Sequence, residues 1–359
     1  MDKKDAIILQ QLEVIRTMTE RNLRSMGDDF WGTPFEGVLS PKSPSGGKPV
    51  GSADGKMPAQ PSDGKTAGGQ PAAKAEKTEE VEPLPKEDMK DLQAELDSYI
   101  GLATVKEEVR NLINMASVYK LRRQHDLPTT DMSLHMVFTG NPGTGKTMMA
   151  RMMARIYRSL DILSKGQLVE VDRSGLVAGY VGQTAIKTQK VIQKAIGGVL
   201  FIDEAYALNG KSENDFGQEA IDTILKAMED HRDDLVVIVA GYTDLMDRFI
   251  HSNPGLESRF NRFLLFEDYT SDEMLDIFKM QCKKGCYQLS DGVEELVRDY
   301  ITEENGDPET FGNARGVRNI FEHILVAQNN RLAAMETVTK EDLMTLTQDD
   351  VLHARGKLD

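Results

Sequence analysis

The octapeptide GNPGTGKT, residues 140–147, constrains this chain more than any other feature. It matches the pattern G-x-x-x-x-G-K-[ST], with an apolar run before it and a helical pattern after it. In such a strand–loop–helix unit the glycines let backbone N–H groups wrap phosphates, while the lysine and the hydroxyl group serve the outer phosphates and Mg²⁺. An ordinary Gly-rich turn is the alternative, but the flanking strand and helix count against it. The octapeptide therefore predicts a phosphate-binding loop.

A second apolar segment, VLFI at 199–202, ends in the acid pair Asp203 and Glu204. In phosphoryl transfer one such acid holds Mg²⁺ and another orients the attacking water. Acids also favour helix N-termini, but that alternative explains one acid better than a pair about sixty residues after a phosphate-binding loop. We predict that Asp203, together with Thr147, binds Mg²⁺ and that Glu204 polarises water.

Short apolar runs alternate with helical stretches from about Glu87 onward. The predicted strands are residues 135–140, 168–172, 199–203, 235–241 and 263–266. This alternation is typical of a parallel sheet with helices on both faces. After Tyr269 the strands stop, residues 271–332 are mainly helical, and the tail from Val338 adds a strand-like or helical edge. We predict an α/β fold with a parallel five-stranded sheet, followed by a small, mainly helical domain.

The N-terminal region differs from the rest of the chain. Residues 1–28 carry apolar side chains at helical spacing, and an aromatic motif with the only Trp follows. From Pro41 to about Lys86 apolar side chains nearly vanish, so this segment cannot offset its ordering entropy by burial and is predicted to be a disordered linker. The predicted organisation is an N-terminal helix and aromatic motif at 1–35, a flexible linker at 36–86, the sheet domain at 87–268 and the helical domain at 269–359.

Composition counts against several classes of protein. The formal net charge of −15 argues against a dedicated nucleic-acid binder, because phosphate backbones are bound by clustered Lys and Arg. Cys282 and Cys286 are the only cysteines, so we predict neither a disulfide framework nor a metal site from them. No apolar run approaches the ~20 residues of a membrane span, and the N-terminus is not a signal peptide. We therefore expect a cytoplasmic protein.

Longer blocks of sequence narrow the interpretation. They are GGVLFIDEA, GYVGQTA, DFGQEAIDTILKAMEDHRDDLVVIVAGY, SNPGLESRF and FGNARGVRN. With GNPGTGKT, these resemble AAA+ ATPases of the CbbX type, the activase of red-type Rubisco, whose relatives include stage V sporulation protein K and the ATPase domain of EccA. The resemblance covers about residues 88–355. It implies an AAA+ P-loop domain with a helical lid, and ATP and Mg²⁺ as cofactors.

The resemblance also assigns roles to arginines. Arg259 in SNPGLESRF matches the arginine finger that enters a neighbouring subunit's site, with Arg262 as a second candidate. Arg315 in FGNARGVRN matches the sensor-2 arginine that reaches the γ-phosphate from the lid, with Arg318 one helical turn on as the alternative. The catalytic residues are thus predicted to be Lys146, Asp203, Glu204, Arg259 and Arg315.

Further positions follow from the same resemblance. The segment at 99–101 matches the one beside the adenine, and the sensor-1 role falls to Tyr242 or Thr243. The predicted nucleotide-binding residues are Tyr99, Ile100, Gly101, Asn141, Pro142, Gly143, Thr144, Gly145, Lys146, Thr147, Met148 and Arg315. The loop Tyr180, Val181 and Gly182 matches an aromatic–aliphatic–Gly pore loop that grips a polypeptide. From spacing alone, a turn with a core tyrosine is the alternative.

The resemblance implies a ring, a homo-hexamer, that couples ATP hydrolysis to remodelling or partial threading of a protein client through a central pore. A nucleic-acid motor or loader is the alternative, and it shares every nucleotide motif. The net acidity and the aromatic loop disfavour it. We expect residues 1–35 to engage the client, an adaptor or the ring, and packing on the chain's own ATPase domain is the alternative. The identity of the client stays open.

Overall fold

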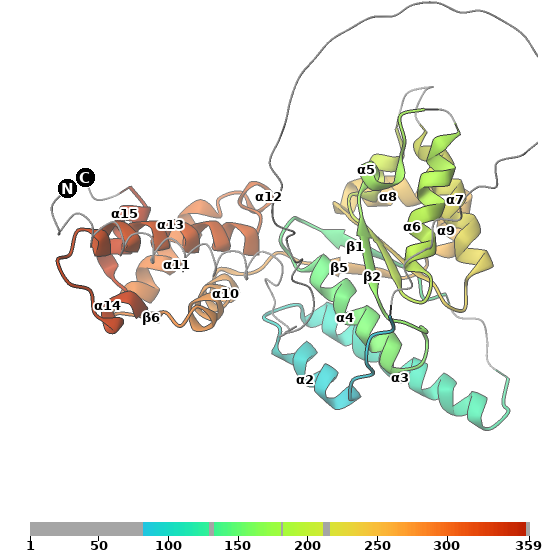
Figure 1. Ribbon diagram of the computed structural model, residues 1–359, viewed down its shortest axis with the longest axis horizontal. Coiled ribbons are helices and arrows are strands. Elements are labelled where there is room, and N and C mark those ends of the chain that lie inside the picture. The colour runs from blue at the N-terminus through green and yellow to red at the C-terminus, as the bar shows by residue number, and fades with distance from the viewer. Residues whose placement is uncertain (1–81, 129–132, 181, 211–215, 357–359) are drawn as a thin grey trace, which may run out of the picture.

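A five-stranded parallel sheet organises the larger part of the molecule (Figure 1). The computed structural model describes residues 82–128, 133–180, 182–210 and 216–356. The strands are β1 (Met136–Gly140), β2 (Leu168–Val171), β3 (Val199–Ile202), β4 (Val236–Gly241) and β5 (Phe263–Phe266). They lie in the order β2-β3-β4-β1-β5, and every neighbouring pair is parallel. The predicted α/β fold with five parallel strands is confirmed.

Helices cover both faces of this sheet, which explains why its central strands are almost continuously apolar. One face carries α2 (Met89–Ser98), α3 (Ala103–Gln124) and α4 (Lys146–Ser159). The other carries α5 (Arg173–Leu176), α6 (Gln183–Ala195), α7 (Gly217–Asp230), α8 (Thr243–His251) and α9 (Pro254–Arg259), with the 3-10 turn η1 (Ala205–Leu208). Successive strand residues enter opposite cores: Phe138 packs on the first side and Val137 on the second. The methionines of α4 are buried core residues.

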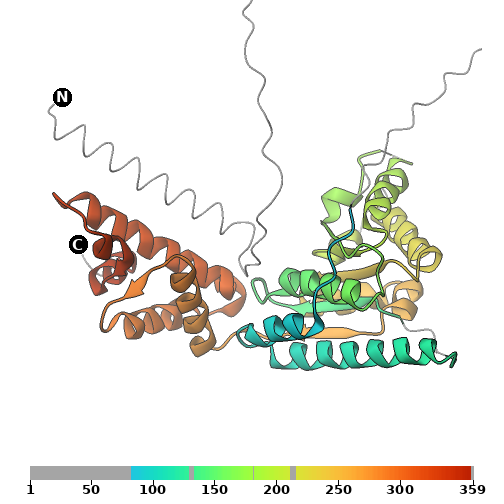
Figure 2. The same cartoon turned by 60° about the horizontal axis from the view of Figure 1, so that its bottom comes forward.

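The lid is a helical unit beside the sheet domain, and Figures 1 and 2 show α10 and α12 at the end nearest to it. Its elements are α10 (Ser271–Lys284), β6 (Gln288–Leu289), α11 (Val293–Glu304), α12 (Pro308–Phe311), α13 (Ala314–Ala333), α14 (Lys340–Met344), β7 (Thr345–Leu346) and α15 (Gln348–Ala354). The prediction that strands stop after Tyr269 was wrong for β6, which forms a parallel pair with β7. β7 lies in the tail from Val338, where a strand-like or helical edge was expected. Strands of two residues are too short to show the period-2 pattern by which a strand is predicted.

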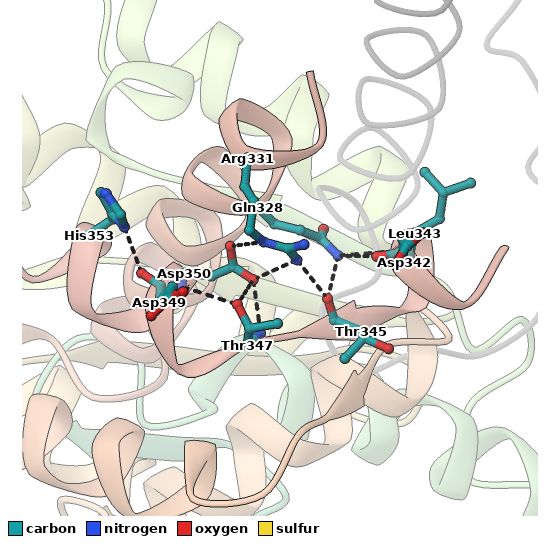
Figure 3. Close-up of polar contacts among 9 residues, drawn as sticks. All are labelled: Gln328, Arg331, Asp342, Leu343, Thr345, Thr347, Asp349, Asp350 and His353. Carbon is teal, nitrogen blue, oxygen red and sulfur yellow. Dashed lines mark hydrogen bonds and ion pairs between the residues drawn. The ribbon is translucent and has the colours of Figure 1, made fainter. Parts of the chain in front are cut away.

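Polar contacts fasten the C-terminal elements of the lid to α13 (Figure 3). Arg331 donates to both carboxylate oxygens of Asp350, at 2.8 and 3.0 Å, and Asp350 is 1% exposed. Gln328, also buried, donates to the Thr345 and Leu343 carbonyls at 2.9 and 3.2 Å. Charge-assisted, two-pronged contacts of this kind fix geometry as well as adding stability. The lid is therefore a rigid unit whose position depends on how α13 and α10 leave the sheet domain.

The N-terminal helix predicted at 1–28, the 1–35 element and most of the predicted linker lie outside the described residues. The chain is already in contact with the sheet domain at Leu84, within the segment predicted as linker. The Leu84 N–H donates to the Lys165 carbonyl at 2.8 Å, and Arg158 donates to the Leu84 carbonyl at 3.0 Å. None of the helices in the described part of the chain combines the length and the apolar character needed to cross a bilayer.

Candidate functional site

The predicted phosphate-binding loop joins β1 to α4 at the carboxyl edge of the sheet. Gly140, Gly143 and Gly145 have φ values of 141°, 72° and 95°, which side-chain-bearing residues rarely adopt. Gly145 is the N-cap of α4, and no side chain caps the helix there. The first-turn N–H groups, with the positive end of the helix dipole, are thus presented to the loop. This cradle fits a polyphosphate.

Lys146 is the first residue of α4, and its side chain folds back over the loop. Its Nζ donates to the carbonyls of Gly140 and Asn141 at 2.8 and 2.7 Å. The pKa of Lys146 is lowered to about 8, chiefly by burial and also by the charge of Arg315, while the carboxylates of Asp203 and Asp268 oppose the shift. With this pKa the Lys146 ammonium is mostly charged at pH 7 but loses its proton more readily than an exposed lysine, and an arriving anion stabilises the charged form.

We expect nucleotide binding to draw a proton onto Lys146 at alkaline pH. At about pH 8.5, half a unit above its pKa, roughly three quarters of the Lys146 side chains are neutral, and phosphate oxygens favour the charged form. Titration calorimetry with an ATP analogue, in buffers of different ionisation enthalpy, should report uptake of about 0.7 proton near pH 8.5 and little near pH 7.

Lys146→Arg is the matched control, because a guanidinium stays charged over this range. Its proton uptake near pH 8.5 should disappear. Equal uptake in the wild type and in Lys146→Arg would assign the proton to another group.

The acid pair lies directly after β3, at the same edge of the sheet. Glu204 has φ 48° and ψ 42°, a left-handed conformation that is costly for a residue with a side chain. Its N–H donates to Asp203 Oδ1 at 3.0 Å, and its own carboxylate is exposed. Of the two carboxylates, Asp203 is the one whose charge raises the pKa of Lys146.

The described residues contain no group of three or more His, Cys, Asp or Glu side chains that could hold a metal ion. A Mg²⁺ at Thr147 and Asp203 would complete its octahedron with phosphate oxygens and water, as this ion commonly does. The donor set therefore fits a nucleotide-bound Mg²⁺ and does not fit a metal bound by protein alone.

The lid brings Arg315 to the loop. A Cβ added to Gly143 would lie 3.0 Å from the Arg315 backbone nitrogen, and the Arg315 charge acts on Lys146. The alternative, Arg318, instead pairs with Glu322 on its own helix, at 2.9 Å. The geometry favours Arg315 over Arg318 as the lid arginine at this site.

The segment at 99–101 also reaches the start of α4. A Cβ on Gly145 would lie 3.4 Å from the Tyr269 hydroxyl and 3.6 Å from the Leu102 side chain. Gly101, with φ 62°, lies against Tyr269 and Glu273 of the lid. The Tyr99 hydroxyl donates to Glu95 at 2.9 Å, so this ring is held inward. The predicted adenine-side segment is thus brought to the loop, at the junction with the lid.

Arg259 is not brought to this chain's own loop. It ends α9 and forms an ion pair with Glu229 at 2.6 Å, and Glu229 is 71% exposed. The second candidate, Arg262, donates to the Ser133 carbonyl at 3.0 Å and contacts Met115. Arg262 therefore serves a packing role, and Arg259 stays a predicted finger for a neighbouring subunit.

The predicted pore loop lies between α5 and α6. Tyr180 is 75% exposed, which excludes the core-tyrosine alternative, and Val181 lies outside the described residues. A Cβ on Gly179 or Gly182 would meet nothing within 4 Å. The base of the loop, in contrast, is held by a hydrogen bond, in which the Ala178 N–H donates to Thr184 Oγ1 at 3.0 Å. The structure thus holds an exposed aromatic side chain on a short, anchored loop.

Tyr242 and Thr243 follow β4 at the edge that also carries the loop and the acid pair. Tyr242 precedes α8 and its ring lies 6.2 Å from that of Tyr206. Which of the two serves as sensor 1 stays a prediction. Three residues at the site were missed from the sequence: Asp268, Tyr269 and Asn313. Asp268 is the second residue after β5, close to the position where Asp203 follows β3, and an acid just after a strand was the signal that could have found it.

Two protein-family models match the chain. The model of the ATPase family associated with various cellular activities (AAA) matches residues 136–268, and the AAA lid domain matches 270–358. The ribulose bisphosphate carboxylase/oxygenase activase of Cyanidioschyzon merolae is 46% identical over 268 residues, 74% of this chain and 90% of that protein. Stage V sporulation protein K of Bacillus subtilis is 40% identical over 265 residues, 73% and 82% of the two chains. The solved AAA domain of FIGL-1 is similar in fold, with a TM-score of 0.51 at 18% identity over 73% of this chain and 82% of that one.

A parallel sheet with a phosphate-binding loop after β1, covered at one edge by a helical lid, defines a P-loop nucleotide-binding protein. The chain belongs to the AAA family of ATPases, and within it to the CbbX type. It is an ATP-hydrolysing enzyme.

Proposed function

We propose that this ATPase is a motor that remodels a protein client. The observation that carries the proposal is Tyr180, an aromatic side chain that is 75% exposed on an anchored loop with open space at both glycines. A flat aromatic face can grip a polypeptide without reading its sequence. The similar activase of Cyanidioschyzon merolae is named for its action on a protein, ribulose bisphosphate carboxylase/oxygenase, which supports a protein client of unknown identity here.

The site residues have distinct proposed roles. The α4 N-terminus and Lys146 bind the β and γ phosphates, and Thr147 and Asp203 hold Mg²⁺, which lowers the charge on the transferring group when it is bound. Glu204 orients and polarises the attacking water. Arg315 reaches the γ-phosphate from the lid. The charges of Asp203 and Arg315 both act on the pKa of Lys146, and this proximity to Lys146 supports the assignment.

We further propose that the subunits assemble into a ring, a homo-hexamer, with ATP bound between neighbours. Arg259 is the motivation, because its side chain serves no role at its own loop and its partner Glu229 is exposed. Exposed ion pairs add little stability, so Arg259 can change partner at small cost. Residues 1–35 are proposed to engage the client, an adaptor or the ring.

Replacing Tyr180 by Ala should separate client engagement from hydrolysis. With casein as an unfolded probe polypeptide, we expect wild-type ATPase to be stimulated. Tyr180→Ala should keep basal ATPase within about threefold, since the loop does not contact the nucleotide, and should lose the stimulation. Tyr180→Phe, which keeps the ring, should retain it. ATPase rates with and without casein provide the measurement.

Duplex DNA forms the second arm of this experiment. Stimulation of the wild type by DNA and not by casein would favour the nucleic-acid motor. A Tyr180→Ala protein that unfolds, or that responds to casein as the wild type does, would remove the pore-loop role from Tyr180.

A further inference from the structure

A hydrogen-bonded cluster around the buried Asn313 joins the phosphate-binding loop, the hinge and the lid. Asp268, which follows β5, accepts hydrogen bonds from Asn141 Nδ2 at 3.1 and 2.9 Å and from Asn313 Nδ2 at 2.7 Å. Asn313 Oδ1 in turn accepts from the Tyr269 N–H at 2.9 Å, and its Nδ2 lies 3.3 Å from the Pro142 carbonyl. One carboxylate and one amide therefore connect three segments that are far apart in the sequence.

Asn313 has an unusual conformation for its position. It is fully buried, and its φ of 53° and ψ of −124° are strained for a residue with a side chain. Such strain persists only where the surroundings fix it. Here the three side-chain contacts of Asn313 provide that fixation, and the strained residue is the one at which the chain turns into α13.

The lid backbone meets the loop directly at this point. The Ala314 N–H donates to the Gly143 carbonyl at 3.3 Å, and a Cβ on Gly143 would lie only 2.2 Å from the Gly312 carbonyl oxygen. The two backbones are therefore in direct contact, and the glycine at 143 is what allows so close an approach. A movement of the loop at Gly143 should therefore displace the first turn of α13, which carries Arg315.

We propose that Asn141, Asp268 and Asn313 form a latch through which the phosphate-binding loop and the lid set each other's position. Asp268 and Asn313 are then positioning residues that hold Arg315 toward the loop. The inference rests on the proposed function of Arg315, and it adds the element that makes the lid respond to nucleotide at the loop.

A charge swap tests the latch. Asn313→Asp replaces the amide that donates to Asp268 with a carboxylate, so a buried carboxylate at 313 faces the exposed carboxylate of Asp268 without a proton between them. Adding Asp268→Asn restores a donor and an acceptor at the same separation, with the direction of the bond reversed and the charge of the pair unchanged. A carboxylate at position 313 also suits the N-terminus of α13. We expect Asn313→Asp to lose the coupling between loop and lid, and the double variant to regain it.

Lid position can be followed by double electron–electron resonance. Cys286 is exposed, whereas burial raises the pKa of the Cys282 thiol to about 12 and keeps it unreactive, so a spin label enters the lid at Cys286. Gln124→Cys, at the exposed end of α3, supplies the label on the sheet domain. In the protein that carries only these two labels, a non-hydrolysable ATP analogue should shift and narrow the distribution of distances between the labels at positions 124 and 286.

Asn313→Asp should lower kcat by about tenfold or more, leave the Kd for the analogue within about threefold, and give a broad distribution that the analogue does not change. In the double variant, which combines Asp268→Asn with Asn313→Asp, kcat should return to within about threefold of wild type. The distance distribution should again change when the analogue is added. If Asn313→Asp does not fold, Asp268→Asn alone, which leaves one acceptor for two amides, should show the same split between kcat and Kd.

Gln328→Ala is the matched control, because it removes a similarly buried amide of the same helix whose hydrogen-bond partners are carbonyls of the C-terminal part of the lid (Figure 3). It should lower Tm but keep the response to the analogue. The latch is overturned if Asn313→Asp responds like wild type, if the double variant stays as defective as the single one, or if Gln328→Ala abolishes the response equally. Absence of binding and hydrolysis in the wild-type protein would instead overturn the proposed function.

Discussion

Glu204→Gln should bind ATP with nearly wild-type affinity and lose almost all turnover. The amide keeps the size of the side chain but cannot accept a proton from water, and general-base contributions of this kind are worth about 10²–10⁴-fold in rate. Glu204 is exposed and follows a buried strand, so the change should not disturb the core. Steady-state ATPase rates and binding of a fluorescent ATP analogue measure the two effects separately.

Glu336→Gln, at an exposed lid position, is the matched control and should keep full activity. Full ATPase in Glu204→Gln would remove the proposed role of Glu204. Loss of binding together with turnover would point to a role in folding or in holding nucleotide. The Glu204→Gln variant also serves as a trap for the client, because it should hold ATP and its partner without release.

Arg259→Ala should reduce kcat by about 10³–10⁵-fold, the range measured for arginine fingers supplied in trans. Its ion pair with the exposed Glu229 should contribute little to stability, so the protein should fold and assemble normally. Because the finger acts on a neighbour, mixing Arg259→Ala with Lys146→Ala subunits should restore part of the activity. At their junction an intact Lys146 meets an intact Arg259.

A mixture of Lys146→Ala with Glu204→Gln subunits is the control, since both changes damage the same site and no junction can repair it. Restoration only in the first mixture would establish action between subunits. An unchanged rate in Arg259→Ala alone, or no restoration where co-assembly is demonstrated by native mass spectrometry, would contradict the trans finger.

Local patterns were enough to predict the nucleotide loop and the sheet. The glycine spacing, Lys146 and Thr147 lie within eight consecutive residues, so their chemistry depends on a backbone shape that the same residues dictate. The central strands β1, β3 and β4 were predictable because each is an apolar run buried on both faces, and such burial leaves a strong signal in composition. The edge strands β2 and β5 are only partly buried, but they are short apolar runs as well. The strand β6 in the lid was missed because a strand of two residues is too short to show an alternating pattern.

The roles of single polar residues depended on distance in space. Arg315 and Arg318 are equivalent in a helical pattern, and only the docking of α13 on Gly143 shows which of them approaches Lys146. Tyr180 could be a core side chain by spacing, and only its exposure of 75% decides otherwise. By sequence pattern Arg259 is an ordinary surface arginine. Only the structure shows that it does not lie at the phosphate-binding loop of its own chain.

The sequence alone determined the phosphate-binding loop, the acid pair and the parallel sheet, because each rests on contacts between residues close along the chain or on burial of a continuous run. Only the tertiary structure decided the latch of Asn141, Asp268 and Asn313. Its members lie 127 and 45 residues apart, and each is a short polar side chain that favours turns and caps on any surface. Hydrogen bonds act over about 3 Å, so their partners become identifiable only when the fold has brought the three segments together.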